Sequence, residues 1–130
     1  MGGKCTRGTV IEVNLDPSVG REIMKIRPCV VIQNDIGNKY SQTTIIAPIT
    51  DAEKARRPSP VYVPVQQGEG GLTKDSIVLC NQIRVVDESR LGRTLGKLAD
   101  ATMARVDQGL RISLGLESLG LGSDRPDAMP

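Results

Sequence analysis

The sequence feature that most limits the possible folds of this chain is a series of short apolar runs, each followed by turn residues. The runs are rich in Val, Ile and Thr, which favour strands. They predict strands at Arg7–Leu15, Cys29–Ile32, Thr43–Ile49, Val61–Val65, Ser76–Cys80 and Gln82–Val86. Pro64 lies inside one of them, and a proline cannot donate to a ladder of hydrogen bonds, so that strand is expected at the edge of a sheet.

The pattern changes in the last third of the chain. The stretch from Asp87 to Leu98 is polar with scattered leucines and predicts no element. After it, apolar residues recur at the spacing of one helical stripe, at Met103, Val106, Leu110 and Leu114. Asp100 is the expected N-cap of this C-terminal helix. Strands followed by one helix predict a small, mostly antiparallel barrel or sheet on which the helix packs.

The length of 130 residues suits one domain with one core. We expect a flexible N-terminus over residues 1–6, a single domain over 7–116 and a disordered tail over 117–130, where Gly, Ser, Asp and Pro dominate. The polar, glycine-containing segment from Ser18 to Ile26 predicts a mobile loop that leads into Arg27. The turn residues from Asp35 to Asn38 predict a turn.

The composition excludes several kinds of chemistry. The chain has no histidine, so a Ser-His-Asp triad and any His-containing metal site are excluded. Cys5, Cys29 and Cys80 have no paired spacing, which argues against a zinc site or a disulfide framework. Cys29 and Cys80 lie in apolar runs and are predicted to be core residues. We expect no metal or cofactor, no membrane contact and a cytoplasmic setting.

Arg27 is the most suggestive single residue. Pro28 holds it extended at the mouth of a buried strand, where a guanidinium is well placed to meet an anion. A surface salt bridge is the simpler explanation of this residue alone. The net charge of +2 does not by itself predict a nucleic-acid binder. The other cationic cluster, which comprises Lys54, Arg56 and Arg57, is interpreted as a solvated loop.

Three blocks of sequence, taken together in their order and spacing, resemble the MazF/PemK toxins of bacterial toxin–antitoxin pairs. They are Arg7–Val10 with Leu15–Pro17 and Gly20, then Arg27–Ile32, then Asp75–Val78 with Gln82–Arg84. The resemblance covers roughly residues 7–116. The segment from Asn34 to Asn38 is similar to the Gram-positive MazF branch.

The resemblance implies an SH3-like (MazF/CcdB-type) barrel, a homodimer and a metal-independent endoribonuclease that cuts single-stranded RNA. It also implies a MazE-like antitoxin as a partner. The family's catalytic arginine and threonine fall on Arg27 and Thr50. RNA-binding roles fall on Glu22, Lys25, Ser76, Gln82 and Arg84. Where many relatives carry an acidic residue, this chain has Asn81, so a carboxylate base is not available there.

The residues fit internal attack by the 2′-OH of RNA, which leaves a 2′,3′-cyclic phosphate and a 5′-hydroxyl. Arg27 would meet the charge that builds on the phosphate, while Thr50 is too weak a base to act alone. Simpler roles stay open: Thr50 as a turn cap, Ser76 as a partner of strand-end backbone, Gln82 paired with backbone and Tyr40 in the core. A gyrase-binding toxin of the same fold and a non-catalytic RNA-binding relative are the alternative functions.

Overall fold

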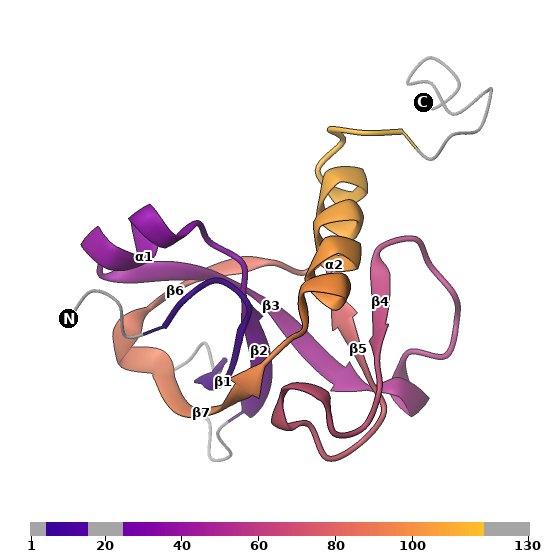
Figure 1. The fold of residues 1–130 in the computed structure, drawn as a ribbon, viewed down its shortest axis with the longest axis horizontal. Coiled ribbons are helices and arrows are strands. Elements are labelled where there is room, and N and C mark those ends of the chain that lie inside the picture. The colour runs from indigo at the N-terminus through magenta and orange to yellow at the C-terminus, as the bar shows by residue number, and fades with distance from the viewer. Residues whose placement is uncertain (1–4, 16–24, 119–130) are drawn as a thin grey trace.

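The computed structural model describes residues 5–15 and 25–118. The strands are β1 (Thr9–Asn14), β2 (Ile26–Val31), β3 (Thr43–Asp51), β4 (Tyr62–Val65), β5 (Ser76–Leu79), β6 (Arg84–Asp87) and β7 (Leu91–Lys97) (Figure 1). The helices are α1 (Asp35–Tyr40) and α2 (Asp100–Ser113), with 3-10 turns η1 (Ala52–Lys54), η2 (Glu69–Gly71) and η3 (Glu88–Arg90). Residues 1–4, 16–24 and 119–130 lie outside this description, and with them most of the predicted N-terminus, loop and tail. No helix among the described residues is long and apolar enough to cross a membrane.

All strand pairs are antiparallel. The strand order is β4-β5-β3-β2-β1-β7, with β6 also paired to β3. The expected antiparallel sheet with a C-terminal helix is therefore confirmed. Among the described strands β4 and β7 do not pair with each other, so the sheet is twisted but not closed into a ring. The strand that contains Pro64 is at one edge, as its proline predicts.

Strand β3 is the centre of the sheet, and its partner changes along its length. One side pairs with β2, while the other pairs first with β6 and then with β5. Ile46 pairs with Arg84 and Ile49 with Val78. Only Ala47 and Pro48 separate those two β3 residues, whereas residues 79–83 separate their partners. The longer segment must leave the plane of the ladder here, opposite a proline that has no N–H to donate.

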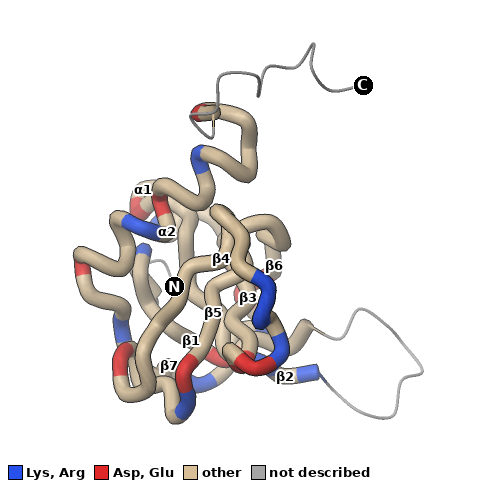
Figure 2. The backbone as a smooth tube through the Cα atoms, turned by 90° about the vertical axis from the view of Figure 1, so that its right-hand side faces the viewer, with Lys and Arg blue, Asp and Glu red and all other residues tan. Residues whose placement is uncertain are grey.

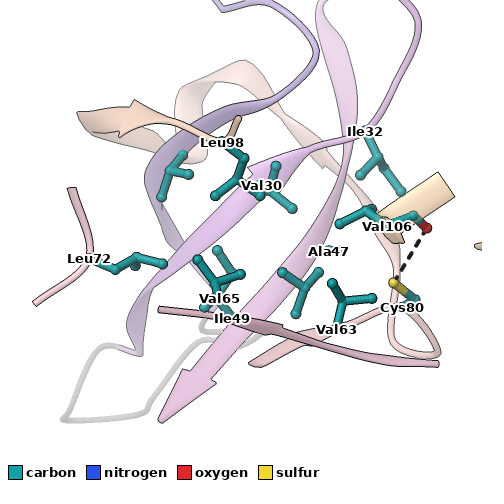
Figure 3. Packing of buried hydrophobic residues seen from close by; sticks show 12 residues of the cluster. Val30, Ile32, Ala47, Ile49, Val63, Val65, Leu72, Cys80, Leu98 and Val106 are labelled. Atoms are coloured by element: carbon teal, nitrogen blue, oxygen red, sulfur yellow. Dashed lines mark hydrogen bonds between the residues drawn. The ribbon is translucent and has the colours of Figure 1, made fainter. Parts of the chain in front are cut away.

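Alternation along the strands buries both faces of the sheet. In β1, Val10 faces one apolar cluster, and Ile11 and Val13 face the other. The first cluster lies under α2 and comprises Val10, Val30, Ile32, Ala47, Ile49, Val63, Val65, Leu72, Val78, Cys80, Leu98 and Val106 (Figure 3). The second comprises Cys5, Ile11, Val13, Cys29, Val31, Ile46 and Val86. The predicted core positions of Cys29 and Cys80 are confirmed, and both thiols are free.

Helix α2 lies close to the sheet because of a glycine. A Cβ on Gly109 would be 2.9 Å from the Cys80 Sγ atom. The Cys80 thiol points toward the helix and donates to the Val106 carbonyl oxygen at 3.8 Å (Figure 3). Glycine costs about 1 kcal/mol in a helix interior, so the close packing must offset that cost.

Two local predictions are wrong. The N-cap of α2 is Ala99, not Asp100; its N–H donates to the Glu69 carboxylate at 3.0 Å. Asp100 is in the first turn, where a negative charge favours the helix dipole. The predicted turn after Asn34 is helix α1, because the Asn34 side chain accepts a hydrogen bond from the Gly37 N–H at 2.7 Å and caps it.

The strand β7 was not predicted. It pairs with β1, but most of its side chains are exposed or half-buried, so the sequence shows no clear alternation of apolar and polar residues.

Candidate functional site

An open groove of about 490 Å³ lies where β2 begins and β3 ends. We call it the β2–β3 groove. Its lining residues are Leu15, Arg27, Pro48, Ile49, Thr50, Lys54, Leu79, Gln82, Ile83 and Arg84. Blue Lys and Arg segments lie near β2 and β3 in Figure 2, with a red acidic segment beside them.

Adjacent strands bring Arg27 and Thr50 to the same groove. Cys29 of β2 pairs with Pro48 of β3 in an antiparallel ladder. That pair is the last of the β2–β3 ladder, and Arg27 and Thr50 each lie two residues beyond it on their own strands. Both belong to the face of the sheet on which Cys29 is buried, because side chains alternate along a strand. The two predicted catalytic residues therefore line one groove from adjacent strands.

Arg84 reaches the same groove from the other side of β3. It pairs with Ile46, which belongs to the buried cluster that contains Cys29. Burial raises the pKa of the Cys29 thiol to about 12, and the nearby charges of Arg84 and Arg27 act in the opposite direction. Both guanidinium groups therefore lie near one buried, neutral thiol, and that thiol is not a nucleophile at neutral pH.

The groove is strongly cationic. Its lining holds Arg27, Lys54 and Arg84, with no acidic side chain among the described lining residues. The side chains of these three residues form no hydrogen bond or ion pair with any other residue in the described part of the chain. Among the described residues Arg27 thus has no surface salt bridge, and a concentration of unpaired cations favours an anionic ligand.

Thr50 does not cap a turn. It remains in β3 and pairs with Ile77 of β5. The next residue, Asp51, provides the cap, because its carboxylate accepts from the Glu53 N–H at 3.0 Å and opens η1. Hydrogen bonds from the Glu53 backbone and from Lys74 hold the pKa of Asp51 below its usual value. The Thr50 hydroxyl is left available to a ligand in the groove.

The remaining predicted residues are more scattered. Gln82 is exposed and lines the groove, whereas Lys25 is exposed and does not line it. Ser76 is 6% exposed and donates its hydroxyl to the Lys74 carbonyl oxygen at 2.8 Å, away from the groove. Glu22 lies outside the described residues. Tyr40 is on α1, 77% exposed, so it is neither in the core nor in the groove.

Lys54 is the groove residue that sequence reasoning missed. The sequence predicts a solvated loop after Thr50, but η1 turns the chain so that Lys54 lines the groove with Arg27. The available signal was Asp51, an aspartate of the type that caps a turn by accepting a hydrogen bond from a backbone N–H two residues later.

The fold and the groove define a small antiparallel β protein whose cationic site suits a phosphodiester chain. Residues 6–114 match the family described as PemK-like, MazF-like toxin of type II toxin–antitoxin system. An endoribonuclease MazF of Staphylococcus epidermidis is 45% identical over 113 residues, which cover 86% of this chain and 92% of the relative. The chain therefore belongs to the PemK-like, MazF-like toxin family.

Solved structures share the fold. A mycobacterial endoribonuclease in complex with its cognate antitoxin superposes with a TM-score of 0.73 at 23% identity, covering 88% of this chain and 98% of that one. MazF from Deinococcus radiodurans gives a TM-score of 0.69 at 24% identity, with 85% and 96% covered.

Proposed function

We propose that this protein is an endoribonuclease toxin that cuts single-stranded RNA in the β2–β3 groove. The observation that carries the proposal is that Arg27 and Thr50, from adjacent strands, line one groove whose charged lining residues, among those the structure describes, are all cations. Family membership and the Staphylococcus epidermidis endoribonuclease support the reaction class.

The attacking group in this proposal is the 2′-OH of the RNA. The 2′-oxygen adds to the adjacent phosphorus, and negative charge builds on the non-bridging oxygens. Arg27 donates hydrogen bonds to those oxygens, for which a guanidinium has the right fork geometry. Thr50 hydrogen-bonds the 2′-OH or a phosphate oxygen from the adjacent strand. The products are a 2′,3′-cyclic phosphate and a 5′-hydroxyl.

RNA binding uses the residues around this pair. Arg84 contacts a neighbouring phosphate, and Gln82 reads a base edge from the segment that leaves the ladder opposite Pro48. Lys25, at the exposed start of β2, adds affinity that falls with salt. Ser76 supports this edge of the sheet through its hydrogen bond to Lys74. Glu22 is proposed as an RNA contact on family resemblance alone.

We propose two protein partners in the cytoplasm. A MazE-like antitoxin with acidic side chains would fill the cationic groove and compete with RNA. A second copy would form a homodimer; Val85, Leu114 and Leu116 are exposed apolar side chains available for it. Light scattering at micromolar concentration should give the dimer mass, and a monomer mass would contradict this assembly.

Incubation of the purified protein with a mixed-sequence RNA in EDTA tests the function. We expect cuts that end in 2′,3′-cyclic phosphate, and none at a site with a single 2′-deoxy substitution. RNA that binds without being cut would instead indicate a non-catalytic RNA-binding protein. Loss of cleavage in EDTA, or cleavage of the deoxy substrate at the same bond, would contradict the mechanism.

A further inference from the structure

Lys54 has no task in the reaction as proposed so far. That reaction breaks the bond between phosphorus and the 5′-oxygen, and the 5′-oxygen departs with a developing negative charge. An alkoxide is a poor leaving group unless it receives a proton as the bond breaks. The site therefore needs a proton donor, and the chain has no histidine to serve as one.

The described lining residues offer few acids. Arg27 and Arg84 carry guanidinium groups, which do not give up a proton in proteins. Thr50 and Gln82 carry a neutral hydroxyl and a neutral amide, which are weaker acids than an ammonium group. Lys54 carries an ammonium group, which can lose a proton and regain it from solvent. On chemistry alone it is the best proton donor in this lining.

The turn η1 holds Lys54 at the groove. Asp51 caps η1 through the Glu53 N–H at 3.0 Å and pairs with Lys74 at 3.4 Å. The Ala52 N–H donates to the Asp75 carbonyl oxygen at 2.9 Å, which ties η1 to β5. Lys54 forms no hydrogen bond or ion pair with the described residues, although its charge is close enough to help lower the pKa of Asp51, so its ammonium group is available to substrate. A backbone held by these hydrogen bonds, with the side chain lining the groove, favours a positioned role rather than a solvated one.

We propose that Lys54 is the catalytic acid that protonates the 5′-oxygen in the β2–β3 groove, an inference that rests on the proposed endoribonuclease function. The bond from the 2′-oxygen to phosphorus forms as the bond from phosphorus to the 5′-oxygen breaks. The proton of the 2′-OH goes to solvent water, and the Lys54 ammonium gives its proton to the 5′-oxygen. Lys54 then takes a proton from solvent, so the protein returns to its starting state.

A substrate that needs no acid tests this role. In RNA with sulfur in place of the 5′-bridging oxygen at the cut site, the leaving group is a thiolate, which departs unprotonated. Lys54→Ala should cut ordinary RNA about 10²–10⁴-fold more slowly than the unchanged protein, the usual contribution of a general acid. The same variant should cut the sulfur-bridged RNA within a few-fold of the unchanged protein. Rates are compared in single-turnover reactions with enzyme in excess.

Matched variants separate acid catalysis from charge. Lys54→Arg keeps the positive charge but not the acid, so it should be as slow as Lys54→Ala on ordinary RNA. Arg27→Ala should be slow on both substrates, since charge on the phosphate builds in either case. Arg57→Ala, an exposed cation of the same loop that does not line the groove, should stay within a few-fold on both.

The outcomes distinguish the two proposals. If the unchanged protein does not cut RNA, the proposed function fails. If it cuts RNA and Lys54→Ala is unimpaired on ordinary RNA, or equally slow on both substrates, Lys54 is not the acid and the proposed function stands. Circular dichroism should show that Lys54→Ala is folded, because the side chain is exposed.

Discussion

Arg27 is available to bind a ligand because the described residues around it do not pair with its side chain. The side chain is half-buried at the start of β2, and none of the described residues forms an ion pair with it. A paired arginine would have to break its partner's contact before it could bind a phosphate. An unpaired arginine at the rim of an apolar cluster is ready to bind, and strand β2 fixes the backbone position from which it extends.

Replacing Arg27 tests this at the residue scale. Arg27→Ala should lower the single-turnover rate by about 10²–10³, as the loss of one donor to a developing oxyanion does. Arg27→Lys should recover only part of the rate, because a point charge lacks the fork geometry. The melting temperature should change little in both variants. A rate loss explained by unfolding would contradict the catalytic role.

The buried thiols predict how stability depends on pH. Burial raises the pKa of Cys29 to about 12 and that of Cys80 to about 11, above the ordinary value of 9.0. The folded state favours the neutral form of both thiols. Their contribution to the free energy of unfolding is therefore complete below pH 9 and is lost as pH rises toward 11–12. The free energy of unfolding, measured in urea, should fall over that range. Cys29→Ala should flatten the fall, whereas Cys5→Ala serves as a comparison.

Contact between α2 and the sheet gives a prediction at the scale of elements. Gly109→Ala should destabilise the fold by about 1–3 kcal/mol, because the new methyl group meets the buried Cys80 Sγ atom at 2.9 Å. Helix propensity alone would give the opposite sign, a gain of about 1 kcal/mol. Adding Cys80→Ala should make the Gly109→Ala change less harmful. Additive effects in denaturant unfolding would show that this contact does not limit the packing.

The elements that sequence could predict are those with a one-sided or buried apolar pattern. Strands β1 to β6 and helix α2 follow from such patterns. Strand β7 does not, because its residues are mostly exposed and it is held by its pairing with β1. Helix α1 depends on the Asn34 cap, which also looks like a turn signal. For these two elements, strand pairing and helix capping determine the secondary structure, and the apolar pattern of the sequence does not.

The site divides in the same way. That Arg27 and Thr50 line one groove could be anticipated, because the family resemblance assigns a role to both residues and Arg27 stands in one of the blocks that carry it. Lys54 could not, since its place depends on the backbone hydrogen bonds of η1 and on its tie to β5. Sequence spacing alone does not show that a residue after Thr50 turns back toward Arg27.

At the scale of the whole molecule, charge predicts how RNA binding depends on salt. Among the described residues three cations line the groove, and neutralising one phosphate of a single strand gives a slope of about −0.7 in log affinity against log salt. For a 2′-deoxy-substituted RNA we expect a slope of about −2 per site. Arg84→Ala should reduce it by about 0.7. A flat response, measured by fluorescence anisotropy, would show that the groove does not hold the backbone.

The strand order has a consequence for when the protein becomes active during its own synthesis. Arg27, Thr50 and Lys54 emerge from the ribosome early, but Arg84 and its pairing with β3 come later, and β7 pairs with β1 near the start of the chain. A growing chain therefore carries its reactive groups before they are assembled into a groove. We therefore expect an endoribonuclease built in this order to leave the message from which it is being translated uncut until the last strand has been made.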